Sequence, residues 1–293
     1  MRSLLFVPAD GGSKLDKAFS SGADAVIIDL EDSVAPDRKA EARVSARSFL
    51  QAALTRPARP RLLVRVNALA TGLTDADLDA VVPARPDAIL LPKAEGGAAI
   101  VQADARLAAR EAAAGIDNGH IKIVALAIET AAGIFQIGTF RGASARLIGL
   151  TWGPEDLSAE LGAEANRDAD GRLTEPYRLA RSLCLFGAAA AEVTAIETVY
   201  VDFRNLEGLR AETEAARRDG FSARLAIHPA QVPVINEVFT PTPEALAKAR
   251  AIIAAFESAP GVGVVAIDGV MYDQPHLLRA QRLIARASAA GIA

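Results

Sequence analysis

The fold of this chain is decided by two apolar segments, VALAIET at 124–130 and RLIGLTWGPEDL at 146–157. The first ends at Glu129, and the second leads to Asp156. Short apolar runs bounded by Gly, Pro or Thr are typical of β-strands that are buried on both faces. Carboxylates at the ends of two consecutive strands indicate either a pair of ligands for a hard cation or two acids that accept backbone N–H groups.

The rest of the chain repeats this pattern of a short apolar strand followed by a helix about eight times. The other expected strands cover residues 4–7, 25–30, 62–67, 88–93, 198–203 and 223–229. Each gap is long enough for a crossover helix, which predicts parallel strands. Eight repeats favour a (β/α)8 TIM barrel over an open doubly wound sheet. The turn ADGGSK (9–14) also lacks the glycine spacing of a dinucleotide-binding sheet.

The pattern changes after residue 229, where a short helix, a Pro-rich turn, a longer helix, a strand and a final helix are expected. We therefore expect two parts, a barrel at 1–230 and a C-terminal helical extension at 231–293. The extension is too short for a large core of its own. It is expected to pack on the barrel or on a neighbouring subunit.

The composition is that of a globular protein with a large core. The chain has 293 residues, of which 51% are hydrophobic and 23% charged, with a formal net charge of -4. No clustered basic stretch indicates a nucleic-acid partner, and no apolar run of about 18 residues indicates a membrane span. The single cysteine, Cys184, excludes an intrachain disulfide and is expected in the core. With no signal peptide expected, the predicted location is the cytoplasm.

Polar residues stand at or just after the ends of the expected strands. They are Asp29, Glu31, Asp32, Arg65, Asn67, Lys93, Glu129, Asp156, Asp202 and His228. In a barrel these ends converge on one mouth, where active sites are built. Several carboxylates in one mouth require pairing or a cation. Oxygen ligands without a His or Cys cluster favour Mg²⁺, or Mn²⁺, over zinc.

Two basic residues in this set have alternative interpretations. Arg65 lies inside the apolar segment LLVRVN and must meet an anion there. That anion is either a substrate carboxylate, which fits the planar guanidinium, or Glu31 or Asp32 in a structural ion pair. Lys93 is either the Schiff-base lysine of a metal-free aldolase or the partner of an acid such as Glu95 or Glu31. A metal pair in the same mouth favours the structural role.

Nine segments occur in order along the chain, namely RSLLFVPA, IIDLEDSV, LLVRVN, ILLPKAE, LAIET, RLIGLTWGPEDL, ETVYVDFRNLEGL, IHPAQV and DGVMYDQP. In these segments the chain resembles the citrate lyase β subunit family, which is grouped with malyl-CoA and citramalyl-CoA lyases in the HpcH/HpaI aldolase superfamily. The resemblance covers nearly the whole chain. It implies a TIM barrel, Mg²⁺ dependence, a homotrimer or homohexamer, and a reaction at a C–C bond of a hydroxyacyl-CoA thioester.

The resemblance also implies roles for residues at the mouth. It places the metal on Glu129 and Asp156. It places the substrate on Arg65, which would bind the oxo-acid carboxylate, and on Glu129. It implies that Glu31 and Asp32 support Arg65 and the waters of the metal. The resemblance therefore implies that Arg65, Glu31, Asp32 and Glu129 act in substrate binding or catalysis, and that Asp156 binds the metal.

Three further roles rest on the resemblance alone. Asp273 in MYDQP matches an acid that relatives deliver from a C-terminal segment, commonly onto the site of a neighbouring subunit. A turn acid before Gln274 and Pro275 is the alternative. Ser13 and Lys14 align with the region near the phosphates of coenzyme A.

The expected function is that of a Mg²⁺-dependent C–C bond lyase. Its substrate would be a hydroxyacyl-CoA thioester of the citryl-, citramalyl- or malyl-CoA type, and its products an oxo-acid and an acyl-CoA. Two alternatives remain. One is a CoA-independent class II aldolase that uses free oxo-acids, and the other is a non-catalytic barrel that acts as a subunit in binding or assembly.

Overall fold

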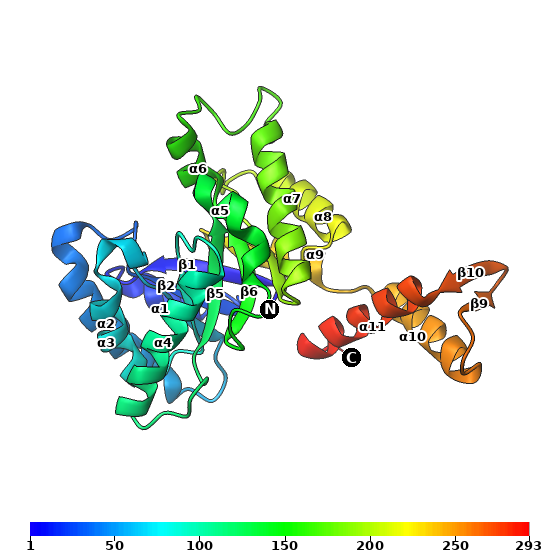
Figure 1. The fold of residues 1–293 in the computed structure, drawn as a ribbon, viewed down its shortest axis with the longest axis horizontal. Helices are drawn as coiled ribbons and strands as arrows, with labels where there is room; N and C mark the ends of the chain where they lie inside the picture. Colours follow the sequence, from blue (N-terminus) through cyan, green and yellow to red (C-terminus); the bar gives the residue numbers. More distant parts are fainter. Residues whose placement is uncertain (293) are drawn as a thin grey trace.

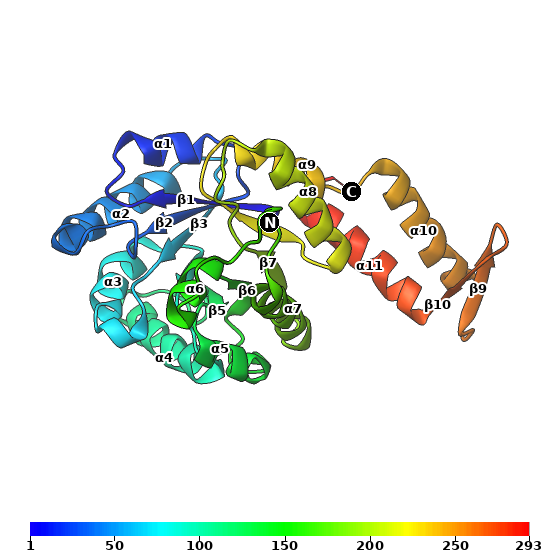
Figure 2. The same cartoon turned by 90° about the horizontal axis from the view of Figure 1, so that it is seen from above.

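The computed structural model describes residues 1–292 and has eight parallel strands that close into a barrel in sequence order (Figures 1 and 2). β1 pairs with β8, which completes the ring. The strands are β1 (Ser3–Pro8), β2 (Ala25–Asp29), β3 (Arg61–Arg65), β4 (Ala88–Leu91), β5 (Lys122–Ile128), β6 (Leu147–Trp152), β7 (Thr194–Glu197) and β8 (Ala223–Ala226). This topology confirms the expected (β/α)8 barrel.

Helices surround the barrel on its outside (Figure 2). The α-helices of this layer are α1 (Ser13–Phe19), α2 (Lys39–Leu54), α3 (Thr74–Val81), α4 (Gly97–Ala113), α5 (Ala131–Gln136), α6 (Pro154–Leu161), α7 (Glu175–Ala190), α8 (Leu206–Asp219) and α9 (Gln231–Phe239). Short 3-10 helices are η1 (Pro36–Arg38), η2 (Leu69–Thr71), η3 (Val82–Ala84) and η4 (Ile137–Phe140). No helix within residues 1–292 is long and apolar enough to span a membrane.

The apolar strand residues form two separate clusters because side chains alternate across each strand. One cluster draws only on strands, with residues such as Ile27, Leu63 and Leu90, and fills the inside of the barrel. The other joins the opposite strand faces to the helices. Cys184 on α7 belongs to this outer cluster and is fully buried, as expected of a core residue.

The seventh strand lies earlier in the chain than predicted. We expected it at 198–203, but β7 ends at Glu197. The N–H of Thr198 donates to the Glu197 carboxylate at 2.9 Å, so the backbone leaves the sheet at that point. The β-branched and aromatic residues that follow favour a strand by propensity, yet they form a loop. Asp202 is consequently an exposed loop residue.

The helix that follows the eighth strand is α9, and it packs on the barrel. The barrel unit therefore extends beyond the expected boundary at residue 230. Val232, Ile235 and Phe239 on α9 are buried in the outer cluster. This packing completes the helical layer next to β8 and α8. The C-terminal extension therefore begins near Thr240.

The extension projects away from the barrel (Figure 1). It consists of α10 (Pro243–Ser258), the hairpin β9 (Val264–Ile267) and β10 (Val270–Asp273), and α11 (Gln274–Ala289). Residues such as Ile252, Phe256 and Tyr272 form a small apolar cluster within it. The extension thus packs mainly on itself, and its packing on a neighbouring subunit stays a prediction.

Candidate active site

A cavity of about 350 Å³ opens at the mouth of the barrel, at the carboxyl ends of the strands. Its apolar wall includes Phe6, Leu126, Trp152, Val199 and Leu225. Its charged residues are Asp29, Arg65, Glu129, Glu155 and Asp156. An apolar cavity with a few converging charged groups is the usual form of a small-molecule site.

Arg65 is held by two carboxylates on one side of this mouth. Its Nε and Nη2 donate to the two Asp29 oxygens at 2.7 and 2.6 Å, and its Nη1 lies 2.9 Å from Glu31 Oε2. Asp29 and Arg65 are direct partners in the register of β2 and β3. The guanidinium also lies 4.9 Å from the centre of the Phe6 ring. The structural ion pair that we considered is therefore present, with Asp29 as its main partner.

The two acids beside Arg65 differ in their pKa. Burial alone would raise the pKa of Asp29, but the hydrogen bonds and charge of Arg65 outweigh it and hold that pKa below its usual range. Burial raises the pKa of Glu31, although the charge of Arg65 and a hydrogen bond from Lys93 oppose the shift. Asp29 is thus a fixed anion, whereas the charge on Glu31 is only partly compensated.

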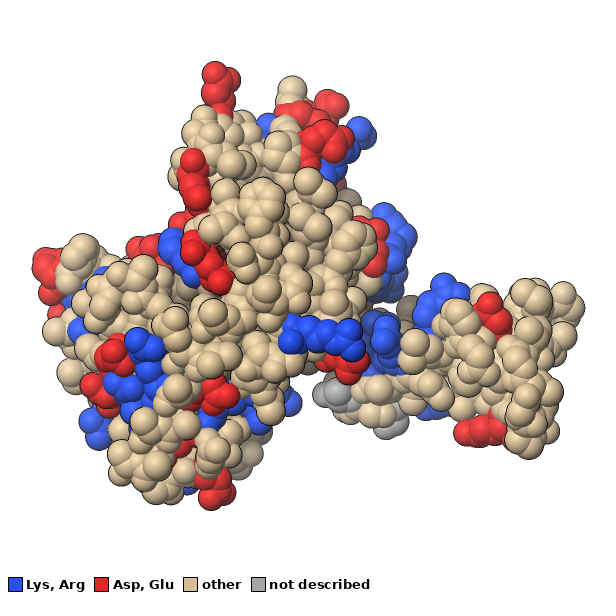
Figure 3. Space-filling view, viewed as in Figure 1, with Lys and Arg blue, Asp and Glu red and all other residues tan. Residues whose placement is uncertain are grey.

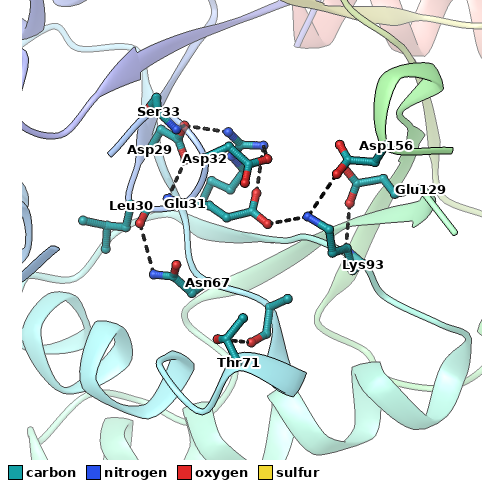
Figure 4. Close-up of polar contacts among 12 residues, drawn as sticks. Asp29, Leu30, Glu31, Asp32, Ser33, Asn67, Thr71, Lys93, Glu129 and Asp156 are labelled. Atoms are coloured by element: carbon teal, nitrogen blue, oxygen red, sulfur yellow. Dashed lines mark hydrogen bonds and ion pairs between the residues drawn. The ribbon is translucent and has the colours of Figure 1, made fainter. Parts of the chain in front are cut away.

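Lys93 connects this cluster to the carboxylates of the next strands (Figure 4). Its ammonium lies 2.9 Å from Glu31 and 3.2 Å from Asp156, and its backbone N–H donates to Glu129 at 2.7 Å. Its φ is 48, an uncommon value for a residue with a side chain. Burial opposes the charged form of Lys93, but these acids raise its pKa. This pairing supports the structural interpretation of Lys93.

Glu129 is a deeply buried carboxylate of the mouth. It follows β5, is only 3% exposed, and accepts one backbone hydrogen bond from Lys93. Burial, and then the charges of Glu31 and Asp156, raise the pKa of Glu129 to about 8. A carboxylate held in this way requires either a proton or a nearby cation.

Local sequence brings Asp156 next to Glu129. Thr130 caps α5 by accepting the N–H of Gly133 at 3.1 Å, so the chain turns directly after Glu129. Gly153 and Pro154 start α6, with Asp156 in its first turn. A Cβ on Gly153 would lie 3.1 Å from both Cγ and Oε1 of Glu129. The glycine therefore leaves room for the Glu129 carboxylate.

These groups suit a hard divalent cation. Within residues 1–292, no cluster of three or more His, Cys, Asp and Glu side chains is arranged to hold a metal. The mouth thus offers two carboxylates, Glu129 and Asp156, as metal ligands. Two is a usual number for Mg²⁺, because this ion keeps several waters or substrate oxygens as its other ligands. Glu31 Oε2 is buried and makes an ion pair with Arg65 Nη1 at 2.9 Å but no well-aligned hydrogen bond within residues 1–292, so it could also accept a hydrogen bond from a metal-bound water.

Other expected site residues lie apart from the cavity. Asp32 is largely exposed and 3.8 Å from Arg65. Ser13 and Lys14 lie exposed on the first turn of α1 and do not line the cavity. Asp273 lies in the extension, where it caps α11 and pairs with His276. Its expected role requires the mouth of another subunit.

Two further candidates have structural roles or lie at the rim. Asn67 is buried and donates to Asp77 at 2.7 Å. His228 is exposed, and its ring stacks on Phe203 with the ring centres 4.8 Å apart. Neither residue lines the cavity.

Sequence reasoning named Glu31 as a partner of Arg65 but missed Asp29, and it missed a support beneath the cavity. The Asp29–Arg65 pair was detectable, because both residues end adjacent parallel strands. Trp152 donates to Glu197 at 2.7 Å, and Arg181 donates to the other oxygen of Glu197 at 2.6 Å. Nothing local in the sequence indicated this second set, since its members come from β6, α7 and β7.

The raised pKa of Glu129 predicts a pH-dependent stability of the metal-free protein. Between about pH 4.5, the usual pKa, and pH 8, the folded chain keeps a proton that the unfolded chain has lost. The free energy of unfolding in EDTA should therefore fall as pH rises through this range, by up to a few kcal/mol relative to Glu129→Gln. Urea unfolding of both proteins from pH 5 to 8 measures this difference, and parallel curves would contradict it.

Family models match nearly the whole chain. The description "HpcH/HpaI aldolase/citrate lyase" matches residues 2–229, and "C-C_Bond_Lyase of the TIM-Barrel fold" matches residues 174–292. The fold and these two matches define a TIM-barrel lyase. The chain belongs to the HpcH/HpaI aldolase/citrate lyase family, which places it among carbon–carbon lyases.

Individual relatives cover nearly the whole chain. A protein of Cereibacter sphaeroides named (3S)-malyl-CoA thioesterase is 39% identical over 98% of this chain and 95% of its own length. A citrate lyase subunit beta-like protein of Mycobacterium tuberculosis is 36% identical over 98% and 95%. The crystal structure of CitE from Mycobacterium tuberculosis, in complex with magnesium, acetoacetate and coenzyme A, has a TM-score of 0.76, 35% identity, and 98% coverage of both chains.

Proposed function

We propose that this protein is a Mg²⁺-dependent lyase that cleaves or forms a C–C bond in a hydroxyacyl-CoA thioester of the citryl-, citramalyl- or malyl-CoA type. The products of cleavage are an oxo-acid and an acyl-CoA. The observation that carries this proposal is the pair of carboxylates, Glu129 and Asp156, beside the partly buried cations Arg65 and Lys93 at the mouth. The complex of the related CitE with magnesium, acetoacetate and coenzyme A supports it.

Glu129 and Asp156 would hold the Mg²⁺ in this proposal. When bound, the ion supplies Lewis acidity at the substrate oxygen whose charge changes during the reaction. Lys93 keeps Glu129 in place through its backbone N–H and balances Asp156 through its ammonium. Glu31 in turn holds Lys93 and Arg65.

Arg65 would orient the carboxylate of the oxo-acid. Asp29 takes up Nε–H and one N–H of Nη2, so the remaining N–H groups of Nη1 and Nη2 are the donors that a substrate would share with the acids. Fixing the carboxylate in this way is an orientation effect. Because Asp29 and Arg65 are locked to each other, the donors are preorganised before substrate binds.

Asp273 would complete the reaction from a neighbouring subunit. In cleavage, the substrate hydroxyl loses its proton to a base, the C–C bond breaks, and its electron pair forms the enolate of the thioester. Asp273 then transfers a proton to the enolate carbon, which gives the acyl-CoA. Ser13 and Lys14 on α1 would contact the phosphates of coenzyme A.

A second candidate is hydrolysis of the thioester, because the relative at 39% identity is named (3S)-malyl-CoA thioesterase. Incubation of the purified protein with Mg²⁺ and malyl-, citramalyl- or citryl-CoA separates the possibilities. A lyase releases an oxo-acid and an acyl-CoA, whereas a thioesterase releases a hydroxy acid and free coenzyme A. Cleavage of free hydroxy-oxo-acids alone would indicate the CoA-independent aldolase, and no turnover of any substrate would contradict an enzymatic role.

We further propose a homotrimer or homohexamer located in the cytoplasm. The hairpin of the extension supports the assembly, since Val264, Val270 and Met271 are at least half exposed there, at 50%, 54% and 61%. Apolar side chains grouped on a projecting element usually contact another chain. Size-exclusion chromatography with light scattering measures the molar mass of the protein in solution, and the mass of a monomer would contradict the assembly. The free, buried Cys184 is consistent with a reducing compartment.

Gly153→Ala should displace Glu129 and weaken Mg²⁺ binding by about tenfold, a typical cost of disturbing the support of a metal ligand. The new Cβ would lie 3.1 Å from two atoms of the Glu129 side chain, which must then move. Gly138→Ala is the matched control, because its Cβ would meet no atom within 4 Å. Calorimetric titration with Mg²⁺ measures both variants. Equal dissociation constants for the two would show that Gly153 does not position Glu129.

A further inference from the structure

A second large groove lies far from the barrel mouth, between α8 of the barrel and helices α10 and α11 of the extension. Its volume is about 760 Å³. Six of its lining residues are cationic, namely Arg217, Arg218, Lys248, Arg279, Arg282 and Arg286. Lysine and arginine side chains gather where the extension meets the barrel (Figure 3). The groove shares no lining residue with the mouth cavity.

The positive charge of this groove is not neutralised by the chain itself. Within residues 1–292, none of the six cations has a carboxylate within 4.0 Å. The acid that lines the groove, Asp219, pairs with Arg181 at 2.7 Å instead. Most other arginines of the barrel have such a partner, for example Arg146 and Arg224. This groove therefore collects six cations that have no acidic partner within residues 1–292.

Three of the arginines form one stripe along α11. Arg279, Arg282 and Arg286 are spaced by three and four residues, which places them on one face of the helix. Like charges at this spacing destabilise an isolated helix. Desolvation by the surrounding protein lowers the pKa of Arg286, and the charges of Arg282 and Arg217 lower it further, although part of the side chain remains exposed. An anion in the groove would relieve this repulsion.

We propose that this groove binds a multiply charged phosphate-bearing anion, either an inorganic polyphosphate or the phosphate groups of a nucleotide. Guanidinium groups bind phosphate oxygens through paired N–H donors. Six cations from two parts of the chain match a ligand with several negative charges better than they match a single carboxylate. Lys248 adds an ammonium that lies 5.8 Å from the ring centre of Tyr272, at the same wall.

Binding there would connect the extension to the barrel. Arg217 belongs to α8 of the barrel, whereas Arg282 and Arg286 belong to α11. A ligand that contacts both helices spans the joint near Thr240 and restricts the orientation of the extension. This consequence does not require the proposed lyase activity, because the groove contains none of the mouth residues.

The experiment measures binding of inorganic triphosphate to the full-length protein in metal-free buffer by calorimetric titration. Arg217→Gln and Arg282→Gln should each weaken binding by about tenfold or more, since each removes a charged hydrogen-bond donor. Arg250→Gln is the matched control, because Arg250 is exposed on α10 and does not line the groove. Its affinity should equal that of the unchanged protein. Retained thermal unfolding temperatures show that the variants are folded.

Four results would overturn the proposal. The first three are absence of triphosphate binding, equal weakening in all three variants, and unchanged binding in Arg217→Gln and Arg282→Gln. The fourth is a change in the oligomeric mass of Arg217→Gln and Arg282→Gln without a change in their triphosphate affinity, because the groove would then contact a second copy of the chain. ATP, titrated in parallel, identifies the source of the phosphates. Tighter binding than triphosphate indicates a nucleotide, and equal binding indicates that the phosphates alone are recognised.

Discussion

Glu129→Gln should weaken Mg²⁺ binding by about 100-fold or more and remove measurable turnover. The substitution keeps the size of the side chain but removes the charge that a hard cation requires. Lewis acidity at the reacting oxygen is then lost together with the ion. In the absence of metal, Glu129→Gln should fold normally. Burial raises the pKa of Glu129 to about 8, so the side chain is already neutral at pH 7 and a neutral amide replaces it at little cost.

Calorimetric Mg²⁺ titrations and steady-state rates measure both effects of this substitution. Glu164→Gln is the control, since it makes the same chemical change at an exposed position after α6 that does not line the cavity. Its metal affinity and rate should match those of the unchanged protein. An unaltered titration for Glu129→Gln would remove Glu129 from the ligand set.

Asp273→Asn should lower kcat by about 10²- to 10⁴-fold while leaving Mg²⁺ affinity unchanged, as expected when a proton-transfer group is lost. Asp273 caps α11 in a reciprocal pair of hydrogen bonds with His276. Asparagine is an equally good cap, so the helix should remain intact. A loss of rate would then report on chemistry rather than on folding. Full activity of the variant would reject the role.

Mixing the two inactive variants tests whether Asp273 acts on a neighbouring subunit. One chain would carry Glu129→Gln and the other Asp273→Asn, and the two would be unfolded and refolded together. A working site combines an intact mouth with an intact Asp273 from the next chain, so about one quarter of the sites should recover in a cyclic assembly with random mixing. No recovery, with both proteins refolded and assembled, would exclude the exchange between subunits.

The barrel was predictable because each strand is a short run of buried apolar residues with helices between them. Parallel strands buried on both faces show as continuous apolar segments, and such segments were found for seven of the eight strands. The error concerned β7, where TAIE is less apolar than the loop that follows it. Propensity favoured the loop, whereas a hydrogen bond from Thr198 to Glu197 ends the strand.

The candidate site was predictable in some of its members but not in its pairings. The ends of parallel strands meet at one mouth, so Arg65, Glu129 and Asp156 were expected together, and all three line the cavity. The position of Lys93 between Glu31 and Asp156 depends on a positive φ that no local pattern signalled. The close approach of Gly153 to Glu129 likewise arises only when β5 and β6 are side by side.

The distant residues were least accessible to sequence reasoning. Asp273 is assigned to the site by resemblance alone, and the strand that ends with it, β10, lies in the extension that projects away from the barrel (Figure 1). The basic groove between α8 and α11 joins segments about sixty residues apart. Its arginines are spread along the chain, so no clustered basic stretch indicated it.

The central claim is that Glu129 and Asp156 bind one divalent cation at the barrel mouth. The most direct test is a crystal of the protein soaked in Mn²⁺ and measured for anomalous scattering, since Mn²⁺ accepts the same oxygen ligands as Mg²⁺. We expect one strong peak within bonding distance of both carboxylates, and no such peak in crystals of Glu129→Gln. A peak bound to other residues, or carboxylates that point away from each other in the presence of the metal, would contradict the account.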